Sequence, residues 1–321
     1  MYNFESVFAD SLIAMLDLRE ARGYKRETYL IHYIRFDRHC AEQHYESPTL
    51  TSEIVHGWLE SNDSYELARR ATAIRLFGQY LDAIGETAYV LPNMYAKGGK
   101  PQSPYIFTDD EMTALFEEID KLEPTKAEPF LDEIAAVLFR LTYTCGLRPN
   151  ESRELLTENV NLGTGEILVT HTKRNKERIV VMSDDMLAMC RDYNQRRDIF
   201  GAGNLNFFPS SLGGPLTNER VYAAFNKAWS AARRTAECPI YKPVRVYSLR
   251  HRFASACLNR WLDDGENLMV MLPYLRAYMG HERLSETAYY IHILPENLTM
   301  SPGVDWAALN AILPEVNKCP D

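Results

Sequence analysis

A stretch rich in proline and glycine divides this chain into a shorter and a longer part. Between residues 92 and 107, any regular pattern is interrupted by Pro92, Gly98, Gly99, Pro101 and Pro104. A chain of 321 residues is long for a single hydrophobic core and commonly folds as two domains. We therefore expect one domain over residues 1–95, a linker over 96–107 and a second domain over 108–321.

The first part has the pattern of a small helical bundle. Apolar side chains recur at three- and four-residue spacing in a first segment from Phe8, a second from Tyr29 and a fourth from Leu67. Thr51 can cap a short helix between the second and the fourth. Gly23 is expected to stop the first helix, and the fourth is expected to end near residue 85.

The second part opens with a helix-capping pattern. Thr108 and Glu111 have the spacing of a capping box ahead of an apolar run. The next apolar segment ends at Gly146, so Arg148 is expected just past a helix end, on a turn fixed by Pro149.

A short hairpin is expected within this helical part. The β-rich runs Glu166–Thr172 and Arg178–Met182 flank a polar turn, with Lys173 at its tip. From Ser183 onward the pattern is helical again. The predicted fold is therefore mainly α with a small β-sheet.

Positive charge is concentrated in one stretch of an acidic chain. The net charge of −9 is unfavourable for binding phosphates. Residues 134–260, however, hold 19 basic and 11 acidic side chains, whereas residues 109–133 hold 2 basic and 10 acidic ones. Because binding depends on local charge, residues 134–260 can still bind a polyanion.

Cysteine usage and hydropathy point to the cytoplasm. The six cysteines form no C-x-x-C pair and lie mostly in apolar or helical runs, so we expect reduced, buried thiols and no metal site. No segment approaches the roughly 20 apolar residues of a membrane span. The first residues lack the layout of a signal peptide.

Six polar residues form the candidate catalytic set: Arg148, Lys173, Tyr247, Arg250, His281 and Tyr290. Cleavage of a phosphodiester by an enzyme nucleophile needs an attacking group, positive charge on the non-bridging oxygens and a proton for the leaving oxygen. The two arginines can clamp phosphate oxygens bidentately, and His281 can donate a hydrogen bond to them. Lys173 is the candidate general acid and Tyr290 the candidate nucleophile, with no metal or ATP required.

The contexts of these residues resemble the active-site boxes of the tyrosine recombinase (phage integrase) family over roughly residues 108–295. The first arginine box resembles Gly146-Leu147-Arg148 with Glu151 and Leu155. Lys173 resembles the family's hairpin lysine. Leu249-Arg250-His251 resembles its second arginine box, and Gly280-His281 with Tyr290 resembles its last box.

The choice of nucleophile and the residue at position 247 are the two uncertain points of the match. Tyr290 is preferred over Tyr289 because the run from Tyr290 to Ile293 matches the family's residues after the nucleophile. Family members usually have His or Lys where Tyr247 stands. A phenol can hydrogen-bond a phosphate but cannot act as a cation, so the role of Tyr247 stays open.

The resemblance implies a site-specific recombinase that cuts and rejoins DNA through a 3′-phosphotyrosyl intermediate and a Holliday junction. A mobile element is the expected user, and which element or host process is served stays open. It implies an N-terminal helical, SAM-like core-binding domain that clamps DNA and a mixed α/β catalytic domain, without a cofactor. The implied partners are double-stranded DNA with a specific recombination site and further copies of the chain in a tetramer on paired sites. Accessory DNA-bending proteins are left open, and no membrane is involved.

Further basic residues are candidates for DNA contacts. Between Thr217 and Ala236, seven-residue spacing places three of them on one helix face: Arg220, Lys227 and Arg234. The aromatic residues expected on the core-facing side of this helix are Tyr222, Phe225 and Trp229. Near the hairpin tip the candidates are Arg174, Lys176 and Arg178. Plain solvent exposure is the alternative explanation for both sets.

Two other functions and one question about the C-terminal tail stay open. A type IB topoisomerase has the same nucleophile and basic set, and a non-catalytic DNA-binding regulator can keep the same fold. The apolar tail over residues 304–313 either closes its own domain or docks on a neighbouring subunit.

Overall fold

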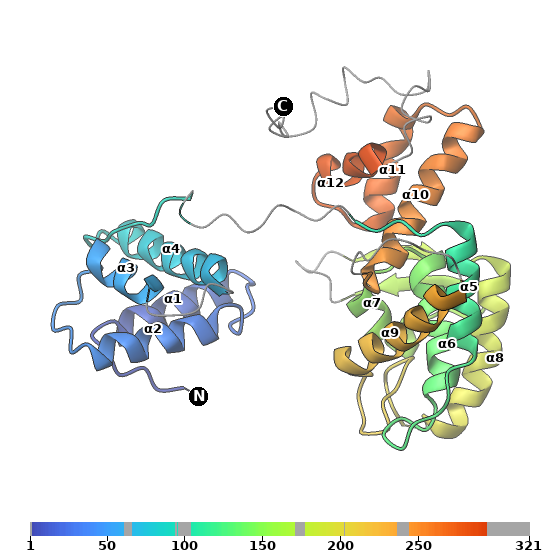
Figure 1. The fold of residues 1–321 in the computed structure, drawn as a ribbon, viewed down its shortest axis with the longest axis horizontal. Helices are drawn as coiled ribbons and strands as arrows, with labels where there is room; N and C mark the ends of the chain where they lie inside the picture. The colour runs from blue at the N-terminus through green and yellow to red at the C-terminus, as the bar shows by residue number, and fades with distance from the viewer. Residues whose placement is uncertain are drawn as a thin grey trace. The chain divides into compact units, whose positions relative to one another are not determined.

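The computed structural model describes residues 2–60, 66–93, 95, 104–170, 177–201, 203–235 and 244–293. The chain divides into two compact units, Met1–Gln102 and Ser103–Asp321 (Figure 1). Each unit has a hydrophobic core of its own.

The first unit is built from four α-helices. They are α1 (Ala9–Ala21), α2 (Leu30–Glu42), α3 (Ser52–Glu60) and α4 (Leu67–Ala83), and α4 packs against the other three. Its core contains a cluster of buried aromatic rings, Phe8, Phe36, Trp58 and Phe77. The Thr51 hydroxyl accepts a hydrogen bond from the Ile54 amide at 3.4 Å, as expected for a cap of α3.

The second unit is mainly helical around one small sheet, which confirms the predicted fold class. Its first half contains α5 (Asp109–Asp120), α6 (Leu131–Thr144), α7 (Pro149–Arg153), the 3-10 helix η2 (Thr157–Asn159), β1 (Glu166–Val169), β2 (Arg178–Val181) and α8 (Asp184–Phe200). Its second half contains α9 (Asn218–Thr235), α10 (Tyr247–Asp263), α11 (Leu268–Met279), α12 (Leu284–Ala288) and the 3-10 helix η3 (Tyr289–Ile293). The two strands pair antiparallel, with Glu166 opposite Val181 and Val169 opposite Arg178.

Two apolar clusters lie within this second unit. The larger one joins α5, α6, the sheet, α8 and α9, and the smaller one joins α10, α11, α12 and η3 and includes Tyr290. Helix α10 packs on α6, and α11 contacts β2. The loops that carry the candidate residues therefore meet where the two clusters join.

Helix ends form where the local signals predict them, and one of them sets the position of Arg148. The capping box of Thr108 and Glu111 forms at the start of α5 as predicted. After α6, Gly146 has φ of +59°, and a Cβ there would lie 2.4 Å from the Phe253 ring. The chain turns at this glycine, and Arg148 becomes the residue that precedes α7, with Pro149 in the first turn.

Four of the six cysteines lie in the described residues, and all four are free thiols. Cys40, Cys145 and Cys190 are buried, and Cys257 is half-buried. Among the helices of the described ranges, none is both long and apolar enough to cross a bilayer.

Candidate active site

Five of the six candidate catalytic residues lie in the described part of the second unit, and they converge from four segments. Arg148 precedes α7, Tyr247 and Arg250 lie in the first turn of α10, His281 follows α11, and Tyr290 lies in η3. The guanidinium of Arg148 donates to the Gly280 carbonyl at 2.8 Å, although 132 positions separate the two residues. Lys173, Arg174 and Lys176 lie outside the described residues.

A buried carboxylate organises this centre. Glu151 Oε2 accepts from the Arg148 amide at 2.8 Å, and Oε1 accepts from Arg148 Nη1 at 2.6 Å. Arg178 donates to both oxygens, at 3.0 Å from Nη1 and 2.7 Å from Nη2. Arg250 Nη1 lies 3.9 Å from Oε2. One acid therefore orients the first arginine and compensates part of the charge of two others.

The ionisation of this group follows from its neighbours. Burial would raise the pKa of Glu151, but hydrogen bonds and charge from Arg178 and Arg148 lower it to about 2. Burial would likewise lower the pKa of Arg148, but Glu151 and then Tyr247 raise it overall. Both groups stay charged at neutral pH, so Arg148 keeps a full positive charge for an anion.

Arg250 is fully buried, with a side chain that is 0% exposed. Its Nη1 donates to the Gly146 carbonyl and its Nη2 to the Met279 carbonyl, both at 2.6 Å. Its Nε is buried and has no hydrogen-bond partner among the described residues. Burial lowers the pKa of Arg250 to about 10, which leaves it cationic at neutral pH.

His281 is held as a neutral ring. Burial, and then the charges of Arg250 and Arg148, lower its pKa to about 3. Its Nδ1 lies 2.8 Å from the Thr287 hydroxyl. When that hydroxyl donates to Nδ1, the ring proton is on Nε2, which is then a hydrogen-bond donor.

Tyr290 is embedded among the other candidates. Its side chain is buried, at 3% exposed, whereas Tyr289 is 40% exposed. The Tyr290 ring stacks on the His281 ring, with centroids 6.1 Å apart and planes 13° apart. Its hydroxyl lies 2.9 Å from His251 Nδ1, and burial raises its pKa.

Tyr247 faces two members of this centre from the first turn of α10. Its ring lies 4.8 Å from the His251 ring, centroid to centroid. Its phenol also helps to raise the pKa of Arg148. Tyr247 therefore belongs to the cluster geometrically, beside His251 and Arg148.

Arg178 differs from the expectation of a DNA contact at the hairpin tip. It begins β2, its side chain is only 8% exposed, and its Nε donates to the Tyr278 carbonyl at 2.8 Å. Its other nitrogens are bonded to Glu151. The guanidinium thus ties the sheet to the arginine box and to the end of α11, and a phosphate would have to displace these bonds.

Helix α9 presents most of the expected face and differs from it at Tyr222 and Arg220. Phe225 and Trp229 are buried as predicted, but Tyr222 is 37% exposed and the prediction for it was wrong. Lys227 and Arg234 are exposed. Arg220 forms an ion pair with Glu128 and donates to the Ala127 carbonyl at 2.7 Å.

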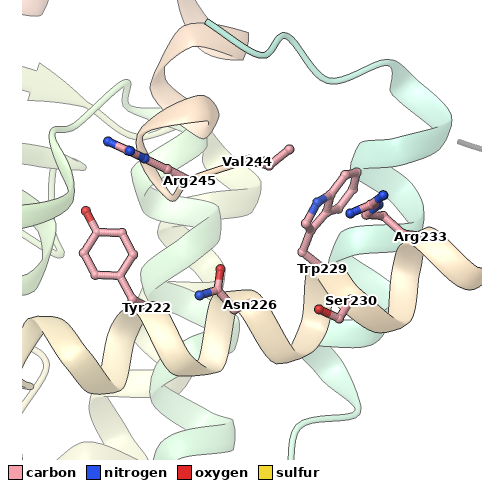
Figure 2. Close-up of a pocket in the computed structure, with 7 residues that line it drawn as sticks. All are labelled: Tyr222, Asn226, Trp229, Ser230, Arg233, Val244 and Arg245. Carbon is pink, nitrogen blue, oxygen red and sulfur yellow. The ribbon is translucent and has the colours of Figure 1, made fainter. Parts of the chain in front are cut away.

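A hollow of about 560 Å³ lies along this helix. It is lined by Tyr222, Asn226, Trp229, Ser230, Arg233, Val244 and Arg245, and Figure 2 shows Tyr222 and Asn226 on the side of α9 that faces Arg245. Arg245 precedes α10 by two residues, so the hollow adjoins the segment that leads into the catalytic centre.

Three residues of the centre had no task assigned from sequence: Glu151, His251 and Thr287. Glu151 and His251 stood inside the two arginine boxes, and the three-residue spacing from Arg148 to Glu151 is itself a capping signal. Thr287 has no comparable signal, because its contact with His281 depends on how α12 folds back. Among the described residues, no three His, Cys, Asp or Glu side chains are grouped to hold a metal ion.

The described geometry agrees with comparisons to known proteins. Residues 106–297 match the model of the phage integrase family. The protein y4rE of Sinorhizobium fredii, which is named as an integrase/recombinase, is 27% identical over 297 residues, covering 91% of this chain and 93% of the relative. The tyrosine recombinase XerC of Oceanobacillus iheyensis is 28% identical over 264 residues, covering 78% of each chain.

Solved structures show the same fold. XerH recombinase bound to a palindromic difH substrate, in a post-cleavage complex, superposes with a TM-score of 0.60 at 16% identity, covering 93% of this chain and 89% of XerH. A lambda integrase tetramer bound to a Holliday junction gives a TM-score of 0.55 at 15% identity, covering 88% of this chain and 76% of that one.

Proposed function

This chain belongs to the phage integrase family of tyrosine recombinases, and on that premise we propose that it cuts and rejoins DNA at a specific site through a covalent bond to Tyr290. The observation that carries the proposal is the position of the Tyr290 hydroxyl. It is buried in a centre where Arg148, Arg250 and His281 converge from separate elements. Such a centre is suited to transferring a phosphoryl group to a tyrosine.

The basic residues supply the electrostatic part of the reaction. Arg148, the more exposed arginine, contacts the non-bridging oxygens of the scissile phosphate from the open side. The Nε of Arg250 provides a donor that lacks a partner among the described residues. His281 donates from Nε2 in the tautomer favoured by Thr287. These donors stabilise the negative charge that gathers on the phosphate in the transition state.

The bond changes are those of a transesterification. The Tyr290 oxygen attacks phosphorus, the bond from phosphorus to the 5′-oxygen breaks, and Lys173 supplies the proton that makes this oxygen a hydroxyl. The product is a 3′-phosphotyrosine, which keeps the energy of the phosphodiester. A 5′-hydroxyl from a partner strand reverses the step, and exchange of strand pairs passes through a Holliday junction.

The DNA surface is proposed to follow α9 and the hairpin. The exposed Lys227 and Arg234 can contact phosphates, as can Arg174 and Lys176. Tyr222 and Asn226 line the hollow beside α9, where an amide side chain can read an adenine edge. The first unit would complete the grip on the duplex as the core-binding domain.

Assembly is proposed to be a tetramer on paired sites, by analogy with the lambda integrase complex on a Holliday junction. Residues 303–321, which lie outside the described residues, are the candidate docking tail. Deletion of this segment is expected to abolish assembly and to leave a folded monomer. An insoluble truncated protein would count against docking.

The decisive experiment is a covalent trap. Genomic fragments of the host bound by this protein would first be selected, and the recovered site would be built into a nicked suicide duplex. The wild type and Tyr289→Phe are expected to give a covalent complex that resists denaturing electrophoresis, whereas Tyr290→Phe gives none. A wild type that binds without a covalent product would indicate a non-catalytic regulator. Relaxation of plasmids without any bound site would indicate a topoisomerase.

A further inference from the structure

We propose that His251 accepts the proton of the Tyr290 hydroxyl as that oxygen attacks the phosphate, an inference that rests on the proposed function. His251 would then be a catalytic residue in its own right, next in sequence to Arg250 and distinct from the six candidates. The cleavage scheme names a donor for the leaving oxygen but no acceptor for the proton of the nucleophile. A phenol attacks poorly while it keeps its proton, so this acceptor needs a place in the site.

The geometry of the pair fits proton transfer. The distance from His251 Nδ1 to the Tyr290 oxygen is 2.9 Å, within the range required of a general base. The two ring centroids are 5.5 Å apart with planes inclined at 54°, so the contact runs through the polar edge of the imidazole. Tyr290 lies in η3 and His251 in the second turn of α10, so each is held by a separate element.

Among the residues that the structure describes, the other groups near the hydroxyl are less suited to take the proton. Arginine has no acceptor atom, which excludes Arg148 and Arg250. The Nδ1 of His281 is already bonded to Thr287, and its ring stacks parallel to that of Tyr290. The phenol of Tyr247 is no stronger a base than the group it would deprotonate.

The surroundings of His251 keep its ring neutral and able to accept. Burial, and then the charge of Arg250, lower its pKa to about 4. The groups that face it are Arg250 and Tyr247 from α10, Tyr290 from η3, and His281 from the segment after α11. A bound phosphate brings negative charge against Arg250, which makes an imidazolium at His251 less costly during the reaction.

With His251 as the acceptor, every proton that moves in the reaction has a donor and an acceptor. The proton moves from the Tyr290 oxygen to His251 Nδ1 as the bond from oxygen to phosphorus forms, while Lys173 loses a proton to the 5′-oxygen. In the rejoining step the imidazolium returns its proton to the departing tyrosine oxygen, and Lys173 takes a proton back from the attacking 5′-hydroxyl. Each cycle of cleavage and rejoining therefore restores both groups without any external acid or base.

The test uses the full chain, saturating protein and the suicide duplex recovered by genomic selection. His251→Asn places an amide near the position of Nδ1 but cannot take a proton, and single-turnover cleavage is expected to fall about 10²- to 10⁴-fold. His251→Ala should be partly restored by added imidazole. The matched control is His56→Gln in the first unit, which likewise puts an amide in place of an imidazole nitrogen that contacts a tyrosine hydroxyl, His56 Nε2 to Tyr89 at 3.3 Å. Its cleavage rate in the bound complex should not change.

A second substrate separates the base from the acid. With sulfur in place of the bridging 5′-oxygen, the leaving group no longer needs a proton. The Lys173→Ala defect should then disappear, while the His251→Asn defect should persist. Rescue of His251→Asn by sulfur, or cleavage by this variant at the wild-type rate, would overturn the assignment while the proposed function stands. A wild type that forms no covalent complex with either duplex would overturn both.

A measurement without DNA covers the case in which the variants fold poorly. Nitrogen-15 NMR of the histidine-labelled wild-type protein at neutral pH should show an unprotonated Nδ1 and a protonated Nε2 for His251. The signal is assigned in the wild type from the contacts of the His251 ring with the rings of Tyr247 and Tyr290. A proton on Nδ1 would make His251 a donor to Tyr290 and would refute the proposal.

Discussion

At the scale of single residues, Glu151 has the greatest structural influence in the centre. Its two oxygens bind both Arg148 and Arg178, and the side chain is nearly buried. A buried ion pair contributes little net stability, but removal of one partner leaves an uncompensated charge. The stability of the second unit should therefore depend on the ionisation of this one acid.

Glu151→Gln is expected to destabilise the second unit by about 3 kcal/mol at pH 7. The pKa of Glu151 is about 2 in the folded protein against an ordinary value of 4.5. The stabilisation is thus fully present above pH 4.5 and is lost as the pH falls toward 2. Hydrogen exchange of peptides from residues 131–153, compared between the wild type and the variant across this range, measures the difference.

The control for this prediction is Glu154→Gln. Glu154 also pairs with an arginine, Arg153, but its side chain is 42% exposed. Removal of this exposed carboxylate should cost about 0–1 kcal/mol, because Arg153 keeps its bond to the Leu216 carbonyl, so exchange should barely change. An equal effect of the two variants, or an effect of Glu151→Gln that grows in acid, would contradict the role of Glu151.

Thr287→Val is expected to slow cleavage about tenfold, since it removes one hydrogen bond worth about 1–1.5 kcal/mol to His281. Thr287→Ser keeps the hydroxyl and should restore most of the rate. Single-turnover cleavage of the suicide duplex gives both values. If serine were as slow as valine, packing rather than the bond to Nδ1 would explain the effect.

At the scale of elements, the sheet is tied to the catalytic loops by Arg178. The register places this residue opposite Val169, in the pair nearest to the hairpin loop. Its bonds reach Glu151 and the Tyr278 carbonyl. A strand that carries such a contact can set the position of the loop that follows β1, which includes Lys173.

Salt dependence of DNA binding separates this role from a phosphate contact. Lys227→Gln should reduce the slope of log K against log salt by about 0.9, because each phosphate contact releases counterions. Arg178→Lys should leave the slope unchanged and lower thermal stability instead. Filter binding at several salt concentrations gives the slopes. A reduced slope for Arg178→Lys would return Arg178 to the DNA surface.

Gly146→Ala is expected to destabilise the second unit by about 2–5 kcal/mol. The positive φ accounts for about 1–2 kcal/mol, and overpacking against Phe253 adds about 1–3 kcal/mol. The melting temperature should fall, and the cleavage rate should fall as well, because the turn also positions Arg148. Phe253→Leu should recover part of the loss in the double variant, and a wild-type melting temperature for Gly146→Ala would contradict the argument.

The helix ends and turns could largely be predicted from the sequence, because the residues that determine them are close together in the chain. The capping box at Thr108, the end of α6 at Gly146 and the turn at Pro149 depend on neighbours within a few positions. The ion-pair partners of Arg178 and Arg220, and hence the orientations of their side chains, could not be predicted in the same way. Each is set by an acid far along the chain, Glu151 for the first and Glu128 for the second.

At the scale of the whole molecule, the chain consists of two units with separate cores. The spread of the catalytic set over nearly half the sequence predicted that the second unit must bring distant segments together. The contacts that do so, such as Arg148 to Gly280 and His251 to Tyr290, follow only from the packing of α10 and α11 on α6 and β2. Periodicity gives no information on which helices become neighbours.

The two units are expected to fold separately when the chain is divided between them. Fragments 1–102 and 103–321 should each unfold cooperatively, because each keeps its own buried cluster. Fragment 103–321 contains every proposed catalytic residue, so at saturating concentration it should cleave the suicide duplex at the wild-type rate. Its affinity should be about 10²- to 10⁴-fold lower, since a linked second binding unit raises the effective concentration. Urea unfolding and gel shift measure these quantities, and a fragment that binds as tightly as the full chain would show that the first unit does not grip the DNA.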